Sequence, residues 1–139
     1  MYIQDFQLEG INRKEGSSIG EQLPSAITWS YKGEKHTITF PQKAIVLLLK
    51  DLENMAVIES PYDKSNKAYI LSGERDIKWN LSELIKDVFP NPQNRYIYFS
   101  DVYYIENQLY FFINTGDIYD YRFSFDPKTG MIGKFITSR

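Results

Sequence analysis

RYIYFSDVYYIENQLYFFINTGDIYDYRFSFDPKTGMIGKFIT, residues 95–137, is the stretch that decides the fold. It consists of short aromatic and β-branched runs separated by turn residues, a pattern typical of antiparallel strands. The runs predict four strands, over residues 95–105, 108–114, 118–125 and 131–137. The predicted turns are Glu106-Asn107, Thr115-Gly-Asp117 and Asp126-Pro-Lys-Thr-Gly130. In the last of these, Gly130 stands where a type I turn needs a residue with positive φ. The stretch therefore predicts a four-stranded antiparallel meander.

Strands are also predicted upstream of this meander. They cover residues 26–31, 35–40, 44–49, 55–59 and 68–71. Lys32-Gly33-Glu34 predicts a hairpin turn between the first two. Residues 44–49 are continuously apolar, which suits a strand buried on both faces; a short helix from Gln42 is the alternative, because periodicity does not separate the two at this length. Residues 10–25 are rich in turn formers and predict a loop or short strand fragments.

One short helix is predicted over residues 81–89. Asn80 stands at its N-cap, and Glu83 follows three residues later, as in a capping box. The apolar side chains recur at helical spacing: Leu81, Leu84, Ile85, Val88 and Phe89. Pro90 ends the helix. Because so short a helix is unstable alone in water, its apolar stripe must pack against another apolar surface.

Residues 44–79 and 97–136 resemble each other as two four-stranded units. Lys67–Leu71, a turn and Asp76–Trp79 align with Tyr121–Phe125, a turn and Met131–Phe135. The segment from Tyr121 to Phe135, with its aromatic strand, Asp-Pro-Lys-Thr-Gly turn and Ile-Gly-Lys-Phe exit, resembles one blade of the quinoprotein-type or WD-type propellers. The resemblance implies antiparallel meanders rather than alternating β and α elements, and it transfers no functional residue. We expect a single mainly β domain over residues 1–139, with one short helix placing it at the margin of the α+β class.

Composition excludes several kinds of site. The chain has 139 residues, a formal charge of −2, no cysteine and one histidine. Disulfides, thiolate zinc sites and multi-histidine metal centres are therefore excluded, and neither a phosphate-binding glycine loop nor a nucleophile elbow occurs. We expect no cofactor, no metal, no nucleic-acid partner and no catalytic residue. The longest apolar run is too short to cross a membrane, the N-terminus does not read as a secretory signal, and a cytoplasmic location is expected.

Aromatic residues are concentrated in the meander, where twelve lie between Tyr96 and Phe125. Two-residue turns would place one set of side chains on a common face. This set is Phe99, Asp101, Tyr103, Ile105, Tyr110, Phe112, Tyr119, Tyr121, Phe123 and Phe125. Two interpretations stay open. Either both faces of the meander are covered, or part of the tyrosine-rich face is an accessible binding patch containing at least three of its four tyrosines.

The function hypothesis is based on the second interpretation, in which part of the tyrosine-rich face is an accessible binding patch. The candidate binding residues are Asp101, Tyr103, Tyr110, Asp117, Tyr119, Asp120 and Tyr121. Tyrosine combines a rigid apolar ring with a hydroxyl, and the surrounding acids would suit a basic protein partner. We therefore expect a non-enzymatic binding protein, similar by analogy to antitoxins and toxin-immunity proteins. The alternatives are a carbohydrate-binding module, although Trp29 and Trp79 lie outside the aromatic cluster, and a small hydrolase using a carboxylate pair.

Overall fold

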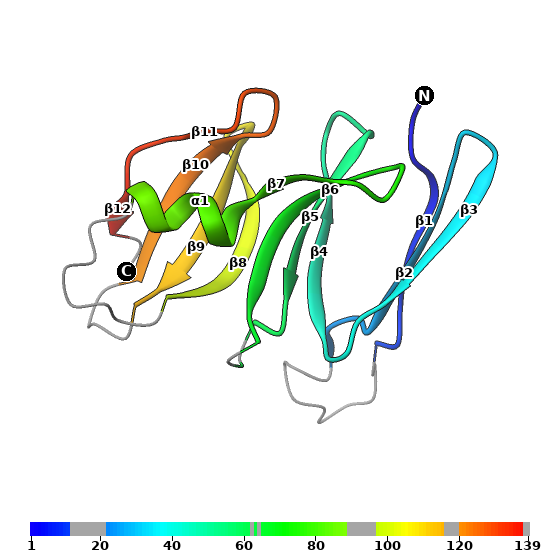
Figure 1. Cartoon of the computed structure of the whole chain (residues 1–139), viewed down its shortest axis with the longest axis horizontal. Coiled ribbons are helices and arrows are strands. Elements are labelled where there is room, and N and C mark those ends of the chain that lie inside the picture. The colour runs from blue at the N-terminus through cyan, green and yellow to red at the C-terminus, as the bar shows by residue number, and fades with distance from the viewer. Residues whose placement is uncertain (12–21, 62, 64, 89–96, 116–119, 138–139) are drawn as a thin grey trace.

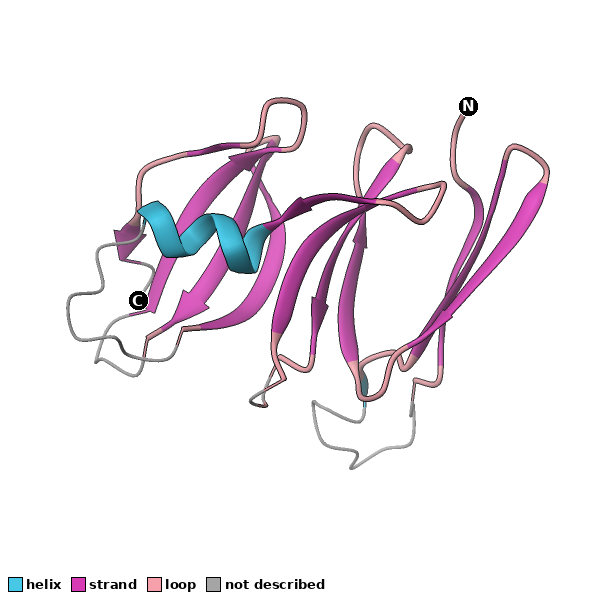
Figure 2. Cartoon of the chain, viewed as in Figure 1, coloured by secondary structure: helices cyan, strands magenta, loops and turns pink. Residues whose placement is uncertain are grey.

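The computed structural model describes residues 1–11, 22–61, 63, 65–88, 97–115 and 120–137. Three antiparallel sheets lie side by side in chain order, with one helix in front of the last sheet (Figure 1). Figure 2 shows how far strands dominate the chain. The predicted mainly β class with one short helix is therefore confirmed.

The first sheet has the order β1-β2-β3 and contains β1 (Gln4–Glu9), β2 (Ala26–Tyr31) and β3 (Glu34–Thr39). The predicted β2–β3 hairpin is confirmed. Lys32 and Gly33 form its two-residue turn, with φ angles of 52° and 80°. Two positive φ values are characteristic of the type I′ turn, whose twist matches that of the flanking strands. Strand β1 was not predicted. Five of its six side chains are exposed, so its sequence shows no hydrophobic periodicity.

The second sheet is the meander β4-β5-β6-β7. Its strands are β4 (Ala44–Leu48), β5 (Asn54–Glu59), β6 (Lys67–Ser72) and β7 (Ile77–Asn80). The apolar run from Ala44 is thus a strand, and the helical alternative is wrong. In β5 the four consecutive residues from Met55 to Ile58 are all buried, so both faces of this sheet are covered.

Helix α1 (Leu81–Val88) follows β7 directly. The predicted N-cap is confirmed, because the Glu83 N–H donates to Oδ1 of Asn80 at 3.3 Å. Leu81 and Ile85 are buried, whereas Val88, predicted as part of the same stripe, is 49% exposed. The helix therefore packs mainly through its first two turns, and predicted residue 89 lies outside the described residues.

The third sheet contains five strands. They are β8 (Tyr98–Ile105), β9 (Gln108–Asn114), β10 (Asp120–Asp126), β11 (Met131–Ile132) and β12 (Ile136–Thr137). The first three form a meander, and both β11 and β12 pair with β10. The predicted strand over residues 131–137 is therefore divided into two. The predicted turn at Glu106-Asn107 is confirmed, with φ angles of 50° and 68°.

Two hydrophobic cores lie on opposite faces of the second sheet. The core toward the first sheet contains Trp29 and Ile27 with Met55, Val57 and Leu71. The core toward the third sheet is formed by the second sheet, α1 and seven residues of β8–β10, namely Phe99, Val102, Leu109, Phe111, Ile113, Phe123 and Phe125. The second sheet is thus the middle layer of the stack.

Each sheet is also joined to the next by a tryptophan. The Trp29 indole N–H donates to the Gly73 carbonyl at 2.8 Å, in the turn between β6 and β7. The Trp79 indole N–H donates to the Pro127 carbonyl at 2.7 Å, in the turn between β10 and β11. These are the two turns that the sequence alignment of residues 44–79 and 97–136 pairs with each other. The repeat itself stays a prediction.

Substitution of Gly130 tests the junction between Trp79 and Pro127. The φ angle of Gly130 is +77°, as predicted, and a Cβ there would lie 2.5 Å from the Trp79 ring. Gly33 has a φ of +80° with nothing within 4 Å of a Cβ. We expect Gly33→Ala to cost about 1–2 kcal/mol from backbone strain alone. Gly130→Ala should cost about 1–3 kcal/mol more, because the methyl group also displaces the indole. Urea unfolding measures both, and equal losses would contradict a close Gly130–Trp79 contact.

The helix cap gives a second stability test. Asn80→Ala removes the acceptor for the Glu83 N–H and should lower the free energy of unfolding by about 0.5–2 kcal/mol. Asn80→Asp keeps a cap oxygen and should retain most of the stability. Thermal unfolding followed by circular dichroism compares the two variants. An Asn80→Ala protein as stable as the wild type would show that the cap contributes nothing.

Candidate binding face on the third sheet

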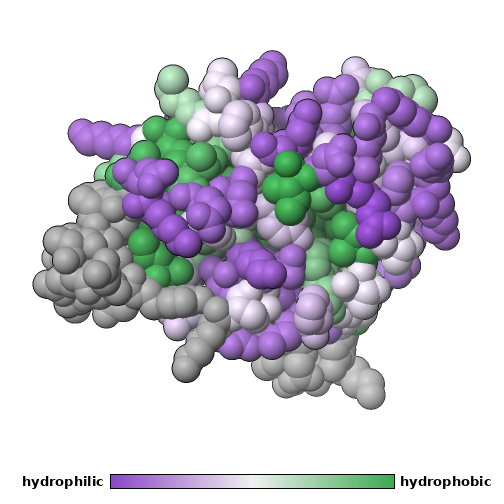
Figure 3. Space-filling view, in the orientation of Figure 1, coloured by the Kyte–Doolittle hydropathy of each residue, from purple (hydrophilic) through white to green (hydrophobic). Residues whose placement is uncertain are grey.

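The stack leaves two outer sheet faces, and they differ in chemistry. On the first sheet, the outward side chains of β3 include Lys35, Thr37 and Thr39, all exposed. Figure 3 shows that hydrophilic side chains dominate the visible surface over this sheet. On the third sheet, the outward side chains include three aromatic rings, Tyr103, Tyr110 and Phe112. An outer face of this kind is unusual, because a solvated sheet face normally carries polar residues.

We call this surface the aromatic face. It consists of the outward residues Asp101, Tyr103, Tyr110, Phe112, Asp120, Arg122, Ser124 and Ile136. Strand pairing places Asp101, Phe112, Arg122 and Ile136 in one row across β8, β9, β10 and β12. A second row contains Tyr103, Tyr110 and Ser124. Residues from four strands thus form one contiguous surface.

Ring contacts organise the aromatic face. The Tyr103 and Phe112 rings are stacked, with centroids 4.5 Å apart and planes inclined by 21°. The Arg122 guanidinium carbon lies 5.4 Å from the centroid of the Tyr110 ring, a cation–π distance. Tyr103 is 43% exposed and Ile136 is 39% exposed, while Tyr110 and Phe112 are partly buried. Tyr103, Tyr110 and Phe112 belong to neither core, so these rings pack on one another at the surface.

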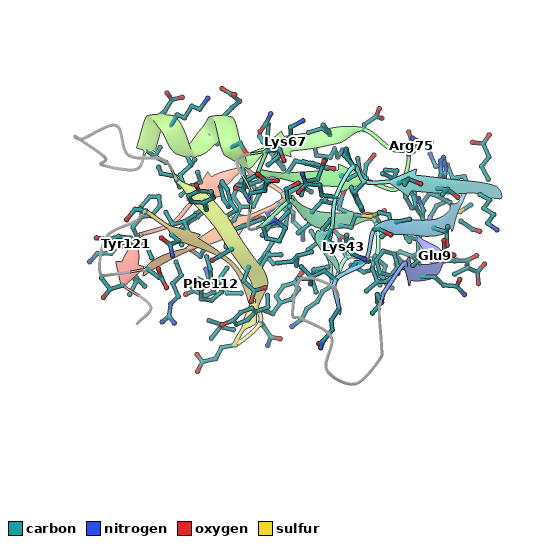
Figure 4. The ribbon with its side chains drawn as sticks, turned by 90° about the horizontal axis from the view of Figure 1, so that it is seen from below. Glu9, Lys43, Lys67, Arg75, Phe112 and Tyr121 are labelled. Carbon is teal, nitrogen blue, oxygen red and sulfur yellow. The ribbon has the colours of Figure 1, made fainter. Side chains whose placement is uncertain are left out.

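The facing predicted for β8 and β9 is confirmed from Asp101 to Phe112, but that of β10 is wrong. The last pair between β9 and β10 is Asn114–Asp120, so an odd number of residues connects the two strands. Even-numbered residues of β10 therefore pair with even-numbered residues of β9, whereas a two-residue turn would pair even with odd. Tyr121, Phe123 and Phe125 therefore point into the core and not toward Tyr110 (Figure 4 labels Tyr121 and Phe112).

Phe99 was also placed on the wrong face. The register shifts between Phe99 and Asp101, which is a β-bulge at Ser100, and Phe99 is buried in the core. A bulge adds one residue to one strand and reverses the facing beyond it. The alternation of side chains along the sequence, on which the predicted facing was based, does not reveal this extra residue.

The structure brings together four of the seven predicted site residues. Tyr103 and Tyr110 are cross-strand partners, and Asp101 and Asp120 lie on the same face, on β8 and β10. Tyr121 lies on the opposite side of the sheet. Asp117 and Tyr119 lie outside the described residues. Of the four tyrosines predicted to form a patch, Tyr103 and Tyr110 lie together on the aromatic face.

Four residues of the aromatic face were absent from the predicted site, namely Phe112, Arg122, Ser124 and Ile136, and the first two make its ring contacts. Phe112 was assigned to the correct face, and its stacking on Tyr103 adds it to the patch. Arg122 was assigned to the opposite face through the incorrect turn length. Only the register across residues 115–119 places this cation among the rings.

The charged groups of the aromatic face are mostly acidic. Asp101 and Asp120 accompany the single cation Arg122, and Asp126 continues the outward row of β10. The Val102 N–H donates to Oδ1 of Asp101 at 2.9 Å, which orients that carboxylate. Asp101 and Asp120 lie on β8 and β10, with β9 between them.

A groove of about 600 Å³ adjoins the aromatic face at Ser124. Its lining residues include Lys50, Tyr104, Asn107, Lys128 and Met131. The Lys50 ammonium lies 4.6 Å from the Tyr104 ring centroid and donates to Oδ1 of Asn107. Lys50 is therefore already engaged within the chain.

The described residues give little support for other kinds of site. No group of three or more His, Asp or Glu side chains there is arranged to hold a metal ion. His36 stacks on Trp29, with ring centroids 5.1 Å apart. Both tryptophans are used in the sheet junctions, so neither provides a platform on the aromatic face. None of the helices in the described ranges is long and apolar enough to cross a membrane.

The two sides of the third sheet should respond differently to truncation. Tyr103→Ala removes an exposed ring and one stacking contact, and should cost about 0.5–1.5 kcal/mol of stability. Phe111→Ala, on the same hairpin, empties a fully buried position and should cost about 3–5 kcal/mol. Chemical denaturation of both variants measures the difference. A loss for Tyr103→Ala as large as that for Phe111→Ala would place Tyr103 in a core.

Comparisons with known proteins identify the fold. No protein-family model matches the sequence, and no curated protein matches it. The structure is similar to a chain in the "Structure of Tne2 in complex with Tni2", with a TM-score of 0.75. The superposition covers 99% of each chain at 15% sequence identity. At this identity the similarity is one of fold, and it extends over the whole three-sheet stack.

Proposed function

We propose that this protein is a non-enzymatic binding protein that engages another protein through the aromatic face. The observation that carries the proposal is the chemistry of the outer face of the third sheet. Three rings and an arginine form a contiguous surface there, whereas the outer face of the first sheet is polar. Tyrosine and arginine are enriched among the residues that dominate binding energy in protein interfaces. A rigid sheet also presents them at little cost in conformational entropy.

The charges of the face indicate the character of the partner. Asp101 and Asp120 lie near its edges, which favours a partner whose surrounding surface is basic. Such rim charges act mainly on the association rate and are screened as the salt concentration rises. The aromatic centre would then supply most of the affinity.

The fold supports a role in a two-protein complex. The whole chain shares its fold with a chain from the structure of Tne2 in complex with Tni2. We propose that the protein acts in a comparable pair, in the cytoplasm, by binding a toxin and neutralising it as an immunity protein does. Fold similarity alone does not transfer function, so the proposal depends on the aromatic face and is tested there.

The test is affinity capture from the native cell with matched variants. The bait proteins are the wild type, Tyr103→Ala and Phe112→Ala, together with Lys35→Ala and Thr37→Ala from the polar outer face of the first sheet. We expect one polypeptide to be retained by the wild type and by both first-sheet variants. The two aromatic variants should bind it about 30-fold more weakly or worse, corresponding to about 2 kcal/mol. Titration of the identified polypeptide by calorimetry measures the affinities.

The immunity-like role has its own readout. Expression of the identified polypeptide alone should arrest growth of a host cell, and co-expression with the wild-type protein should restore growth. Tyr103→Ala should restore it less well, although the protein remains folded. Equal retention by aromatic and first-sheet variants would contradict the proposed face. A retained polypeptide without effect on growth would contradict the immunity-like role.

A further inference from the structure

Arg122 lies in the middle of the aromatic face, between Phe112 and Ile136 across the strands. In the described ranges, the ion pairs join Lys32 to Glu74 and Lys86 to Glu83, and none involves Arg122. Its Nε is buried and makes no hydrogen bond there. A buried donor without an acceptor costs free energy, and the guanidinium stays charged throughout the accessible pH range. Within the described residues, the Arg122 guanidinium therefore has no carboxylate partner, and its Nε has no acceptor.

The surroundings of Arg122 determine what can supply that acceptor. Its guanidinium lies over the Tyr110 ring, and its neighbours across the sheet are Phe112 and Ile136. These apolar groups lower the local polarity, which strengthens a charge-assisted hydrogen bond formed there. The guanidinium carbon lies 5.4 Å from the Tyr110 ring centroid, and the Arg122 residue as a whole is only partly buried. A planar carboxylate matches the N–H edge of a guanidinium with two parallel hydrogen bonds.

We propose that the protein partner places one carboxylate, from an aspartate or glutamate side chain, on the Arg122 guanidinium. Apolar side chains on either side of that acid would contact the Tyr103–Phe112 stack and Ile136. The inference rests on the proposed protein-binding function and specifies the chemistry of its central contact. The partner's contact segment is therefore an acidic residue between apolar ones, within a surface that carries basic groups opposite Asp101 and Asp120.

Two small peptides test this contact directly. One is an acetylated, amidated tripeptide with glutamate between two leucines, and the other has glutamine in place of the glutamate. Each is titrated to 20 mM, about the range expected for so small a ligand, against protein whose aromatic side chains carry ¹³C. Ring signals of Tyr103, Tyr110 and Phe112 are followed by NMR. We expect the glutamate peptide to shift these signals and to bind about tenfold more tightly than the glutamine peptide.

Variants at Arg122 identify the group responsible. Arg122→Gln should abolish the preference for glutamate, and Arg122→Lys should retain part of it, because lysine keeps the charge but not the planar fork. Lys35→Gln, on the outer face of the first sheet, is the matched control and should leave the preference unchanged. Melting curves for each variant confirm that it is folded. If Arg122→Gln fails to fold, Arg122→Lys provides the comparison.

Several results would overturn the inference. These are equal binding of the two peptides, no ring shift with either at 20 mM, or a preference that survives Arg122→Gln. Ring shifts that depend on protein dilution in the absence of peptide would assign the face to a second copy of the chain. If affinity capture still requires Tyr103 and Phe112 in any of these cases, the protein-binding function stands without the carboxylate contact. If the peptides discriminate but no captured polypeptide depends on the face, the proposed function fails instead.

Discussion

The donation of an indole N–H to a backbone carbonyl in the neighbouring sheet is the interaction on which the rest of the structure depends. Trp29 joins the first sheet to the second through Gly73, and Trp79 joins the second to the third through Pro127. In each case a ring fills the junction while its single polar group is satisfied, as a buried tryptophan requires. Each receiving turn also contains a glycine that an aromatic ring approaches closely: Tyr31 lies against Gly73, and Trp79 lies against Gly130. These two junctions set how the sheets stack.

Stacking three sheets creates one layer covered on both sides and two layers covered on one side. The second sheet accordingly has buried side chains on both faces, as the run from Met55 to Ile58 shows. The first sheet ends the stack with a polar surface. The third sheet ends it with the Tyr103–Phe112 stack and Arg122. The fold needs only a solvated surface there, and the aromatic residues of this face are therefore the basis of the proposed binding function.

Local patterns accounted for much of the fold. The α1 cap, the hairpin at Lys32-Gly33 and the left-handed Gly130 depend on residues within a few positions of one another, and all three are observed. For the candidate site, the same reasoning brought together Tyr103 and Tyr110 but assigned Tyr121 to the wrong side. Which face of the sheet a β10 side chain occupies depends on whether the connection after Asn114 has an odd or an even number of residues. A one-residue error in that length moves every later side chain of the strand to the other face.

The sequence by itself determined the class of the protein, most of its strands, its helix and its turns, because each is encoded by spacing and turn chemistry along a short segment. It also determined that aromatic residues would dominate the third sheet. Only the tertiary structure decided which rings are core and which form a surface. That decision followed from the bulge at Ser100, from the register between β9 and β10, and from the side on which the second sheet packs. These are long-range pairings, and they alone placed Arg122 among the rings, because no local pattern specifies what lies across a sheet.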